Sequence, residues 1–260
     1  MEYGLESNPP AADNAWCSQF ERDGFLIVRK LAAPALCQAM LSKAKTDLKA
    51  EAPPLEYESD VQYPGSPATR DAPGGHTVRR LLQAYARATV FRDWATHTVI
   101  TPYLRALLGP KICLAQAHHN CIMTKEPGFS SDTLWHQDIR YWSYTRPELI
   151  NTWLALGREY SENGGLMILP GTHRMRVEAQ RLDANLFLRK DLAENRALMQ
   201  TQVAVELEPG DVLFFHARAF HAASRNRTDK TKFSVVFTYH AADNSPKANS
   251  RSSSIPSISL

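Results

Sequence analysis

Several features that would place this chain in a special class are missing from its 260 residues. No stretch reaches the roughly 18 consecutive apolar residues of a membrane span, and residues 1–10 lack the basic and apolar parts of a secretory signal peptide. The four cysteines form no Cys-x-x-Cys pair and are too scattered for a disulfide framework in a chain of this length. We therefore expect a cytoplasmic protein whose thiols are reduced.

An excess of charge of one sign is absent as well. The chain has 30 Lys and Arg against 27 Asp and Glu, a net charge of +3, and no long basic run. Nucleic acid is therefore not an expected partner. With 43% hydrophobic residues the chain can close one sizeable core, which excludes a disordered protein.

Helical patterns dominate the first part of the chain. Apolar residues at helical spacing predict helices over 33–50 and 77–108. Residues 51–75, between them, are rich in proline and glycine, and an irregular segment of this length is typical of a lid or a binding loop. We interpret 12–110 as helical support together with this lid segment.

From 111 to 243 the sequence pattern is typical of β structure, with short β-like runs separated by turn signals such as Pro209-Gly210-Asp211. The runs are 111–123, 149–156, 166–169, 202–207, 212–215 and 233–239. Strands joined by turns favour antiparallel pairing in a jelly roll, with the early helices packed outside. The predicted class is α+β, mainly β, in a single domain over 1–260. Residues 244–260, rich in serine, are expected to form a flexible tail outside the core.

Among the nine histidines, His136 stands out because Asp138 follows two residues later. In an extended strand, residues i and i+2 point to the same face, so an imidazole and a carboxylate would converge on one point. A second histidine would complete the 2-His-1-carboxylate set that binds non-haem Fe(II). His216 and His221, which follow the 212–215 run, both lie in a suitable region.

A series of short motifs runs in order along nearly the whole chain. The motifs are Phe20-Glu21-Arg22-Asp23-Gly24-Phe25, Lys125-Glu126-Pro127-Gly128, Trp135-His136-Gln137-Asp138, Asn163-Gly164-Gly165-Leu166, Pro170-Gly171-Thr172-His173 and Pro209-Gly210-Asp211-Val212-Leu213-Phe214-Phe215-His216. This series resembles the phytanoyl-CoA dioxygenase family of Fe(II)- and 2-oxoglutarate-dependent oxygenases. The resemblance implies a double-stranded β-helix core of the jelly-roll, cupin-like type.

The same resemblance implies that His136, Asp138 and His221 bind the iron, and that His216 is a second histidine that is not a ligand. It implies 2-oxoglutarate and O2 as co-substrates and succinate and CO2 as co-products. The related halogenases replace the carboxylate with a small residue. A chain that keeps Asp138 is therefore expected to hydroxylate its substrate.

Contacts to 2-oxoglutarate are also implied, with one departure. The family usually has an arginine eleven residues after the distal histidine, where its fork can hold the distal carboxylate, but this chain has Lys232 there. We expect Lys232 to pair with that carboxylate, with Arg225 or Arg227 as substitutes. Asn120 and Trp153 match family positions near the co-substrate.

Substrate contacts are predicted on two segments. Arg140, Trp142 and Tyr144 follow the metal strand and would line the mouth of a jelly roll, and Arg79 would bring positive charge over the pocket. Basic groups there favour an anionic substrate. Since the resemblance extends to hydroxylases of acidic sugars on glycolipids, a Kdo-like sugar or glycolipid is the first choice. A secondary metabolite or an acyl thioester is the alternative.

Two other functions fit the same residues. A jelly-roll protein without turnover would hold only a metal or a ligand, and the Lys232 departure is its best support. A zinc hydrolase would use the same three ligands, but the sequence places no general base beside an open zinc site. The expected partners are O2 and a small-molecule or glycolipid substrate, with peripheral lipid contact but no transmembrane segment. A monomer and a homodimer both remain open.

Overall fold

Two antiparallel β-sheets form the centre of the protein, in a computed structural model that describes residues 14–260. The larger sheet contains β1 (Phe25–Val28), β2 (Leu55–Tyr57), β3 (Val78–Leu82), β4 (Ile112–Lys125), β6 (Leu149–Ala155), β9 (Val212–His216), β11 (Lys232–Ala241) and β12 (Ile258–Ser259). The smaller sheet contains β5 (Thr133–His136), β7 (Leu166–Ile168), β8 (Val203–Ala204) and β10 (His221–Ala223). Over these described residues the strand orders are β1-β9-β6-β11-β4-β3-β2, with β12 paired to β4, and β5-β10-β7-β8. Residues 1–13, which include the opening residues considered above, lie outside the described part of the chain.

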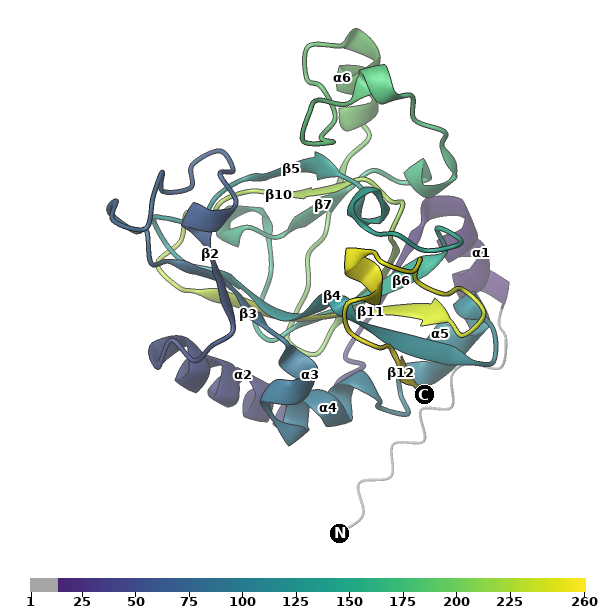
Figure 1. The fold of residues 1–260 in the computed structure, drawn as a ribbon, viewed down its shortest axis with the longest axis horizontal. Helices are drawn as coiled ribbons and strands as arrows, with labels where there is room; N and C mark the ends of the chain where they lie inside the picture. Colours follow the sequence, from purple (N-terminus) through teal and green to yellow (C-terminus); the bar gives the residue numbers. More distant parts are fainter. Residues whose placement is uncertain (1–13) are drawn as a thin grey trace.

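Most helices lie against the outer face of the larger sheet. The helices of residues 14–260 are α1 (Asn14–Asp23), α2 (Pro34–Lys49), α3 (Ala84–Arg87), α4 (Thr89–Ala95), α5 (Thr101–Leu108) and α6 (Ala193–Met199). In Figure 1, α2, α3 and α4 lie beneath the larger sheet, whereas α6 belongs to a lobe that projects beyond the smaller sheet. Within residues 14–260, none of the helices is long and apolar enough to cross a membrane.

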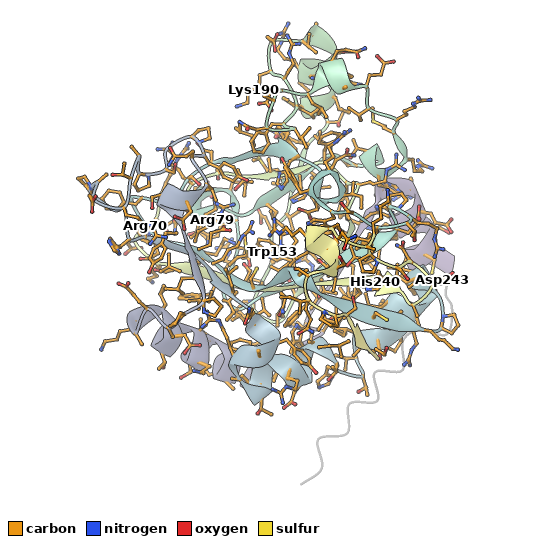
Figure 2. All side chains as sticks on the ribbon, in the orientation of Figure 1. Arg70, Arg79, Trp153, Lys190, His240 and Asp243 are labelled. Atoms are coloured by element: carbon orange, nitrogen blue, oxygen red, sulfur yellow. The ribbon has the colours of Figure 1, made fainter. Side chains whose placement is uncertain are left out.

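The alternation of side chains along β11 separates two apolar cores. Val235 and Tyr239 are fully buried on the helix side, in a core that also contains Trp94 of α4. Val236 faces the other way and packs with Trp153 of β6 between the sheets, and Figure 2 shows Trp153 in the interior of the molecule. Because residues i and i+2 of a strand share a face, one set of β11 side chains lines the space between the sheets. The candidate functional site lies in this space.

The region 77–108 is not helical throughout, because it begins with β3. This strand pairs with both β2 and β4 and extends the larger sheet towards the lid segment. Val78 and Leu81 are both buried in the helix-side core, and their spacing of three residues imitates one face of a helix. The helical prediction is therefore wrong for these residues, and the lid segment itself contributes β2.

The segment 244–260 also differs from the expected flexible tail, because it packs on the larger sheet. Its last strand, β12, pairs with β4, and Ser252 is only 1% exposed. The Ser252 hydroxyl lies 2.6 Å from Nε2 of His118, and the Ser257 hydroxyl lies 2.8 Å from Nε2 of His240. Hydrogen bonds between serine hydroxyls and imidazoles thus hold this segment on the sheet. A search for apolar periodicity does not detect such polar contacts, so the sequence suggested a flexible tail.

Candidate functional site

Three side chains that the sequence links to a metal lie together between the two sheets. β5 ends at His136, a 3-10 turn (Asp138–Tyr141) begins at Asp138, and β10 begins at His221. The two histidines are register partners of neighbouring antiparallel strands, and their ring centroids are 4.2 Å apart. One ligand atom from each of the three residues lies within 4.8 Å of the others. Two adjacent strands thus bring two imidazoles and one carboxylate to a single point.

Backbone carbonyls orient both imidazole rings. Nδ1 of His136 is 2.8 Å from the Leu134 carbonyl oxygen, and Nδ1 of His221 is 3.1 Å from that of Ala219. A ring that donates Nδ1–H in this way directs an Nε2 lone pair inwards, and the two Nε2 atoms lie 3.6 Å and 3.8 Å from carboxylate oxygens of Asp138. Burial, reinforced by the neighbouring His221, lowers the pKa of His136 to about 3, and burial also lowers the pKa of His221. Both rings are therefore in the neutral form that binds metals.

Two further side chains hold Asp138 in place. Asn151 of β6 donates Nδ2–H to one carboxylate oxygen at 2.8 Å, and Nε2 of His119 of β4 lies 3.2 Å from the other. Burial alone would raise the pKa of Asp138, but the imidazoles of His119 and His221 hold it well below its usual value. The carboxylate is therefore ionised. Asn151 and His119 could not be recognised as partners of Asp138 from the sequence, because nothing in local spacing reveals how β4 and β6 align with the 136–138 segment.

Replacing His119 by alanine is expected to weaken divalent-metal binding by roughly 10–100-fold, the usual cost of losing a group that orients a metal ligand. His119→Gln should recover part of this loss, because its amide can still donate to Asp138. The matched control is His118→Ala, since His118 bonds to the tail serine Ser252 instead of Asp138. Calorimetric metal titration of the three variants tests this, and equal losses for His118→Ala and His119→Ala would contradict it.

The three converging side chains fit a non-haem iron centre. Two neutral imidazoles and one ionised carboxylate are the donor set that Fe(II) oxygenases use, and such a set leaves coordination positions open for a bidentate co-substrate and O2. His136, Asp138 and His221 are all buried, with relative exposures of 9%, 4% and 5%. The site is therefore shielded from bulk water as well as chemically suited to the ion.

His216 is not part of this cluster. Its Nδ1 accepts the Arg218 backbone N–H at 3.0 Å, and its ring lies 5.5 Å from that of His173. Burial lowers its pKa to about 3. The structure thus brings His221, and not His216, next to His136 and Asp138.

Lys232 and Trp153 line the space between the sheets, but they contact a carboxylate of the protein itself. Nζ of Lys232 is 2.9 Å from Oε2 of Glu159, and Nε1 of Trp153 donates to both oxygens of Glu159 at 3.1 Å. Lys125, the register partner of Lys232 on β4, is also buried and donates to the Ser131 carbonyl at 2.5 Å. Burial, followed by repulsion from nearby cations, lowers the pKa of Lys125 to about 7. Two lysines and one glutamate therefore occupy the region expected to hold the co-substrate tail.

Asn120 and Arg225 lie elsewhere, so these two predicted contacts need correction. Asn120 pairs in register with Phe237, which faces the helices, and its Oδ1 accepts the Tyr85 backbone N–H of α3 at 2.8 Å. Arg225 is 40% exposed in its side chain and forms an ion pair with Asp132 at 3.3 Å. One residue caps a short helix and the other is held at the surface by a nearby carboxylate.

Arg140, Trp142 and Tyr144, the predicted substrate contacts that follow β5, lie in three different surroundings. Arg140 stays beside the site, where its Nε donates to the Gln137 side chain at 2.8 Å. Trp142 stacks on His118 with ring centroids 4.7 Å apart and meets His119 edge-on at 5.4 Å, so it supports β4. Tyr144 is only 6% exposed and belongs to a small apolar core. The prediction that Tyr144 lines the mouth is therefore wrong, because the chain turns inwards there.

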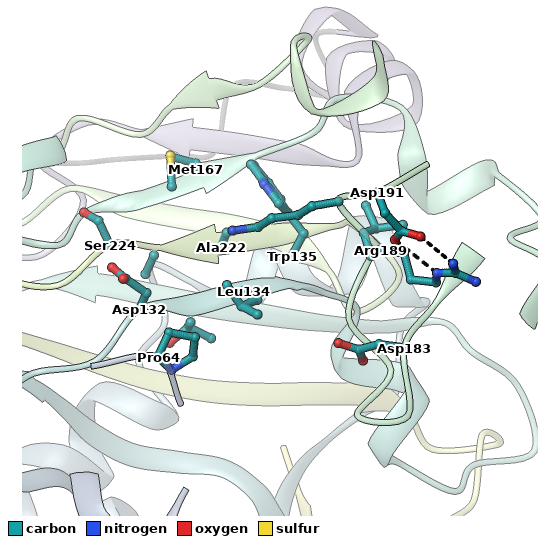
Figure 3. A pocket seen from close by; sticks show the side chains of 14 residues that line it. Pro64, Asp132, Leu134, Trp135, Met167, Asp183, Arg189, Asp191, Ala222 and Ser224 are labelled. Carbon is teal, nitrogen blue, oxygen red and sulfur yellow. Dashed lines mark hydrogen bonds and ion pairs between the residues drawn. The ribbon is translucent and has the colours of Figure 1, made fainter. Parts of the chain in front are cut away.

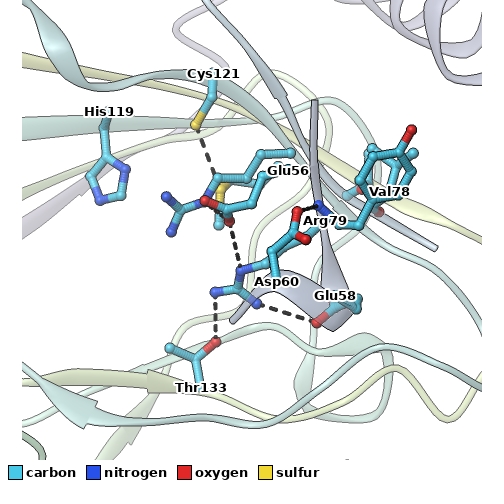
Figure 4. Close-up of polar contacts among 12 residues, drawn as sticks. Glu56, Glu58, Asp60, Val78, Arg79, His119, Cys121 and Thr133 are labelled. Carbon is cyan, nitrogen blue, oxygen red and sulfur yellow. Dashed lines mark hydrogen bonds and ion pairs between the residues drawn. The ribbon is translucent and has the colours of Figure 1, made fainter. Parts of the chain in front are cut away.

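Arg79 is also misassigned as a substrate contact, because it is 2% exposed and surrounded by protein partners. Its guanidinium lies 3.2 Å from Glu56, 3.6 Å from Glu58 and 3.2 Å from the Thr133 hydroxyl (Figure 4). The neighbouring Arg80 is the freer cation. Its Nε lies 3.2 Å from Glu56, and within residues 14–260 its terminal nitrogens donate no hydrogen bond to the protein.

Arg80 lies close enough to the metal cluster to interact electrostatically with Asp138. Burial alone would lower the pKa of Arg80, but the carboxylates of Glu56 and Asp138 are among the groups that raise it. A bulge in the β2–β3 pairing sets which arginine of the adjacent pair faces the site, and it turns Arg80 towards the site in place of Arg79.

Aromatic rings form the wall outside the metal cluster. Phe187 and Tyr141 lie 6.0 Å and 6.3 Å from the His136 ring, and Tyr63 of the lid segment meets Phe187 edge-on at 5.5 Å. A cavity of about 520 Å³ next to them is lined by 61–64, Leu134, Tyr141 and 183–187.

A second cavity of about 620 Å³ lies on the face of the smaller sheet opposite His221, where Trp135, Met167 and Ala222 line it together with 188–191 (Figure 3). The two cavities share Pro64, Leu134 and Asp183 as lining residues. Tyr63 of the lid segment and Phe187 therefore meet beside His136, and the cavity of about 520 Å³ next to them is large enough for a small molecule.

Comparison with known proteins agrees with this geometry. The family described as Phytanoyl-CoA dioxygenase (PhyH) matches residues 20–234. The peroxisomal phytanoyl-CoA dioxygenase of Homo sapiens is 26% identical over 256 residues, which cover 94% of this chain and 72% of the human protein. The ectoine dioxygenase of Sphingopyxis alaskensis is 24% identical over 243 residues, covering 86% and 74% of the two chains.

Solved structures share the fold. EctD from S. alaskensis, determined with 2-oxoglutarate and 5-hydroxyectoine, superposes with a TM-score of 0.75 at 19% identity and covers 95% of this chain and 81% of its own. The epimerase SnoN, in complex with Fe3+, alpha ketoglutarate and nogalamycin RO, superposes with a TM-score of 0.73 at 21% identity, covering 92% and 87%. These superpositions confirm the expected jelly-roll core.

Proposed function

Because this chain belongs to the phytanoyl-CoA dioxygenase family and is an Fe(II)- and 2-oxoglutarate-dependent dioxygenase, we propose that His136, Asp138 and His221 hold its iron and that it hydroxylates an anionic small molecule. The observation that carries the metal assignment is the convergence of two backbone-anchored imidazoles on one ionised carboxylate. The family's activity favours turnover over the non-catalytic and zinc-hydrolase alternatives.

When bound, iron and 2-oxoglutarate supply the oxidant that converts a substrate C–H bond to C–OH, with succinate and CO2 as co-products. The chain contributes the geometry. The Leu134 and Ala219 carbonyls aim both imidazoles inwards, and burial keeps the rings neutral. Asn151 and His119 hold Asp138. The lid and the lobe, which meet through the Tyr63–Phe187 contact, keep bulk water away from the site.

We assign the tail of 2-oxoglutarate to the two buried lysines of the inner face. Lys232 and Lys125 are register partners on β11 and β4, so their side chains project side by side into the space between the sheets. Trp153, 5.0 Å from the Lys232 ammonium, forms one wall of this pocket. These residues would provide the positive charge that the family obtains from arginine.

The substrate class follows from Arg80 and the aromatic rings. A guanidinium beside the metal cluster favours a carboxylate or a phosphate on the substrate, and the flat faces of Tyr141 and Phe187 favour a ring. We therefore propose an acidic, Kdo-like sugar as substrate. The sugar would be either free or part of a glycolipid. A glycolipid substrate would bring the enzyme into peripheral contact with membrane lipid. An acidic secondary metabolite or an acyl thioester is the alternative, and the cavity of about 520 Å³ beside Tyr141 and Phe187 would accommodate a small molecule of either kind.

An anaerobic titration tests the metal and co-substrate assignment. Adding Fe(II) and then 2-oxoglutarate to metal-free protein is expected to produce the weak visible absorption band of a 2-oxo acid chelated to iron. His136→Ala should not produce the band. If the wild-type protein binds Fe(II) and 2-oxoglutarate but the band is equally strong in His136→Ala, the ligand assignment is refuted.

A further inference from the structure

Glu159 is a buried carboxylate that the metal centre does not use. It follows β6 in the chain, is 1% exposed, and accepts hydrogen bonds from the Trp153 indole, the Lys232 ammonium and the Ser234 hydroxyl. The last two contacts are 2.9 Å and 2.6 Å long. A carboxylate held by an ammonium, a hydroxyl and an indole resembles a bound ligand in its recognition site, except that here the carboxylate belongs to the chain.

This cluster lies close to the candidate iron site. Ala223, two residues after His221 on β10, faces the same space as His221 and packs in the same inner core as Trp153. Trp153 in turn donates to Glu159. A 2-oxo acid chelated between the metal ligands would therefore extend its tail towards Lys232, and it would meet Glu159 there.

The charges around Glu159 determine what such a tail encounters. Lys232 is already neutralised by Glu159, at 2.9 Å, and Ser234 is the only other group within hydrogen-bond distance of its Nζ in the described part of the chain. Lys125 faces the same space from β4, and within residues 14–260 the Ser131 carbonyl is the only hydrogen-bond acceptor of its ammonium. A second carboxylate entering this region is attracted by Lys125 but competes with Glu159 for Lys232, and like charges brought together in a dry interior repel strongly.

We propose that Glu159 competes with the distal carboxylate of 2-oxoglutarate for Lys232, and thereby sets both the affinity for this co-substrate and its preference over 2-oxo acids with uncharged tails. The inference rests on the proposed function, because it requires a 2-oxo acid at the metal centre. Glu159 touches neither the metal ligands nor the substrate wall. It is therefore a specificity-determining residue of the co-substrate pocket.

The test compares the dissociation constants of two 2-oxo acids, measured anaerobically by calorimetry on the Fe(II)-loaded protein. Glu159→Gln is expected to tighten 2-oxoglutarate binding about tenfold or more, because Lys232 loses its internal competitor. Binding of 4-methyl-2-oxopentanoate, whose tail carries no charge, is expected to stay unchanged. The double variant Glu159→Gln/Lys232→Met should lose the gain, since the gain acts through Lys232.

Glu162→Gln is the matched control, because Glu162 is exposed and lies in the same loop. A thermal-unfolding scan guards against misfolding of Glu159→Gln: 2-oxoglutarate should raise its melting temperature more than that of the wild type. Unchanged 2-oxoglutarate affinity in Glu159→Gln, weaker affinity, or equal shifts for both acids would overturn the inference. If neither acid binds the Fe(II)-loaded wild type, the proposed function itself fails.

Discussion

Replacing His221 by alanine is expected to abolish 2-oxoglutarate-dependent succinate formation, whereas replacing His216 by alanine leaves it largely intact. The reason is geometric. Nε2 of His221 lies 3.8 Å from an Asp138 oxygen, and its Nδ1 is fixed by the Ala219 carbonyl. His216 instead bonds to the Arg218 backbone and contacts His173. Losing a direct metal ligand should lower the rate of succinate formation by more than about 100-fold, which is the upper range for losing a residue that only orients a ligand.

The comparison is well matched because the two histidines are close in sequence and both are packed in the protein. Succinate release and the affinity for a divalent metal should be measured in both variants, together with a circular dichroism spectrum to establish that each is folded. A folded His221→Ala variant with wild-type metal affinity and turnover would remove His221 from the site. Loss of metal binding in His216→Ala instead would assign the ligand to the earlier histidine.

The clustering of His136, Asp138 and His221 could be predicted because local spacing indicates the first two and the order of motifs, through the family resemblance, indicates the third. His136 and Asp138 are two residues apart, and His221 follows a strand with a recognisable turn before it. The contacts of β4 could not be predicted in the same way. A break in the β4–β11 register falls between Phe237 and Thr238, opposite residues 115–120. This break decides that His119 faces the metal cluster while Asn120 faces α3.

Charge partners were the second kind of information missing from the sequence. The position of Lys232 indicates a cation near the co-substrate, but Glu159 is 73 residues earlier in the chain and only folding brings the two to 2.9 Å. The adjacent arginines pose the same difficulty. Both follow the lid segment, yet Arg79 is enclosed by two carboxylates, whereas Arg80 contacts Glu56 and its terminal nitrogens have no hydrogen-bond partner among the described residues. Local pattern gives the charge of a segment, whereas the fold decides which charge is already neutralised.

The distinction between the two arginines predicts a large loss of stability for one of them. Arg79→Met is expected to lower the free energy of unfolding by about 3–5 kcal/mol, the usual cost of removing one partner from a buried ion pair. Glu58 is fully buried, and it also accepts the Ser131 hydroxyl at 2.5 Å. Without Arg79, Glu58 would lose its ion-pair partner in an interior that water does not reach.

Arg80→Met is the matched control, because it removes the same charge from the next residue of β3. Arg80 contacts Glu56, whose side chain is 23% exposed and can be solvated, so the expected loss of stability is smaller. The double variant Arg79→Met/Glu58→Gln should recover part of the loss, since it removes the unpaired charge. Urea unfolding of the three proteins measures these differences. If Arg79→Met loses as little stability as Arg80→Met, then the fold tolerates an unpaired Glu58. The buried contacts of Arg79 would then not hold the lid segment against the jelly-roll core.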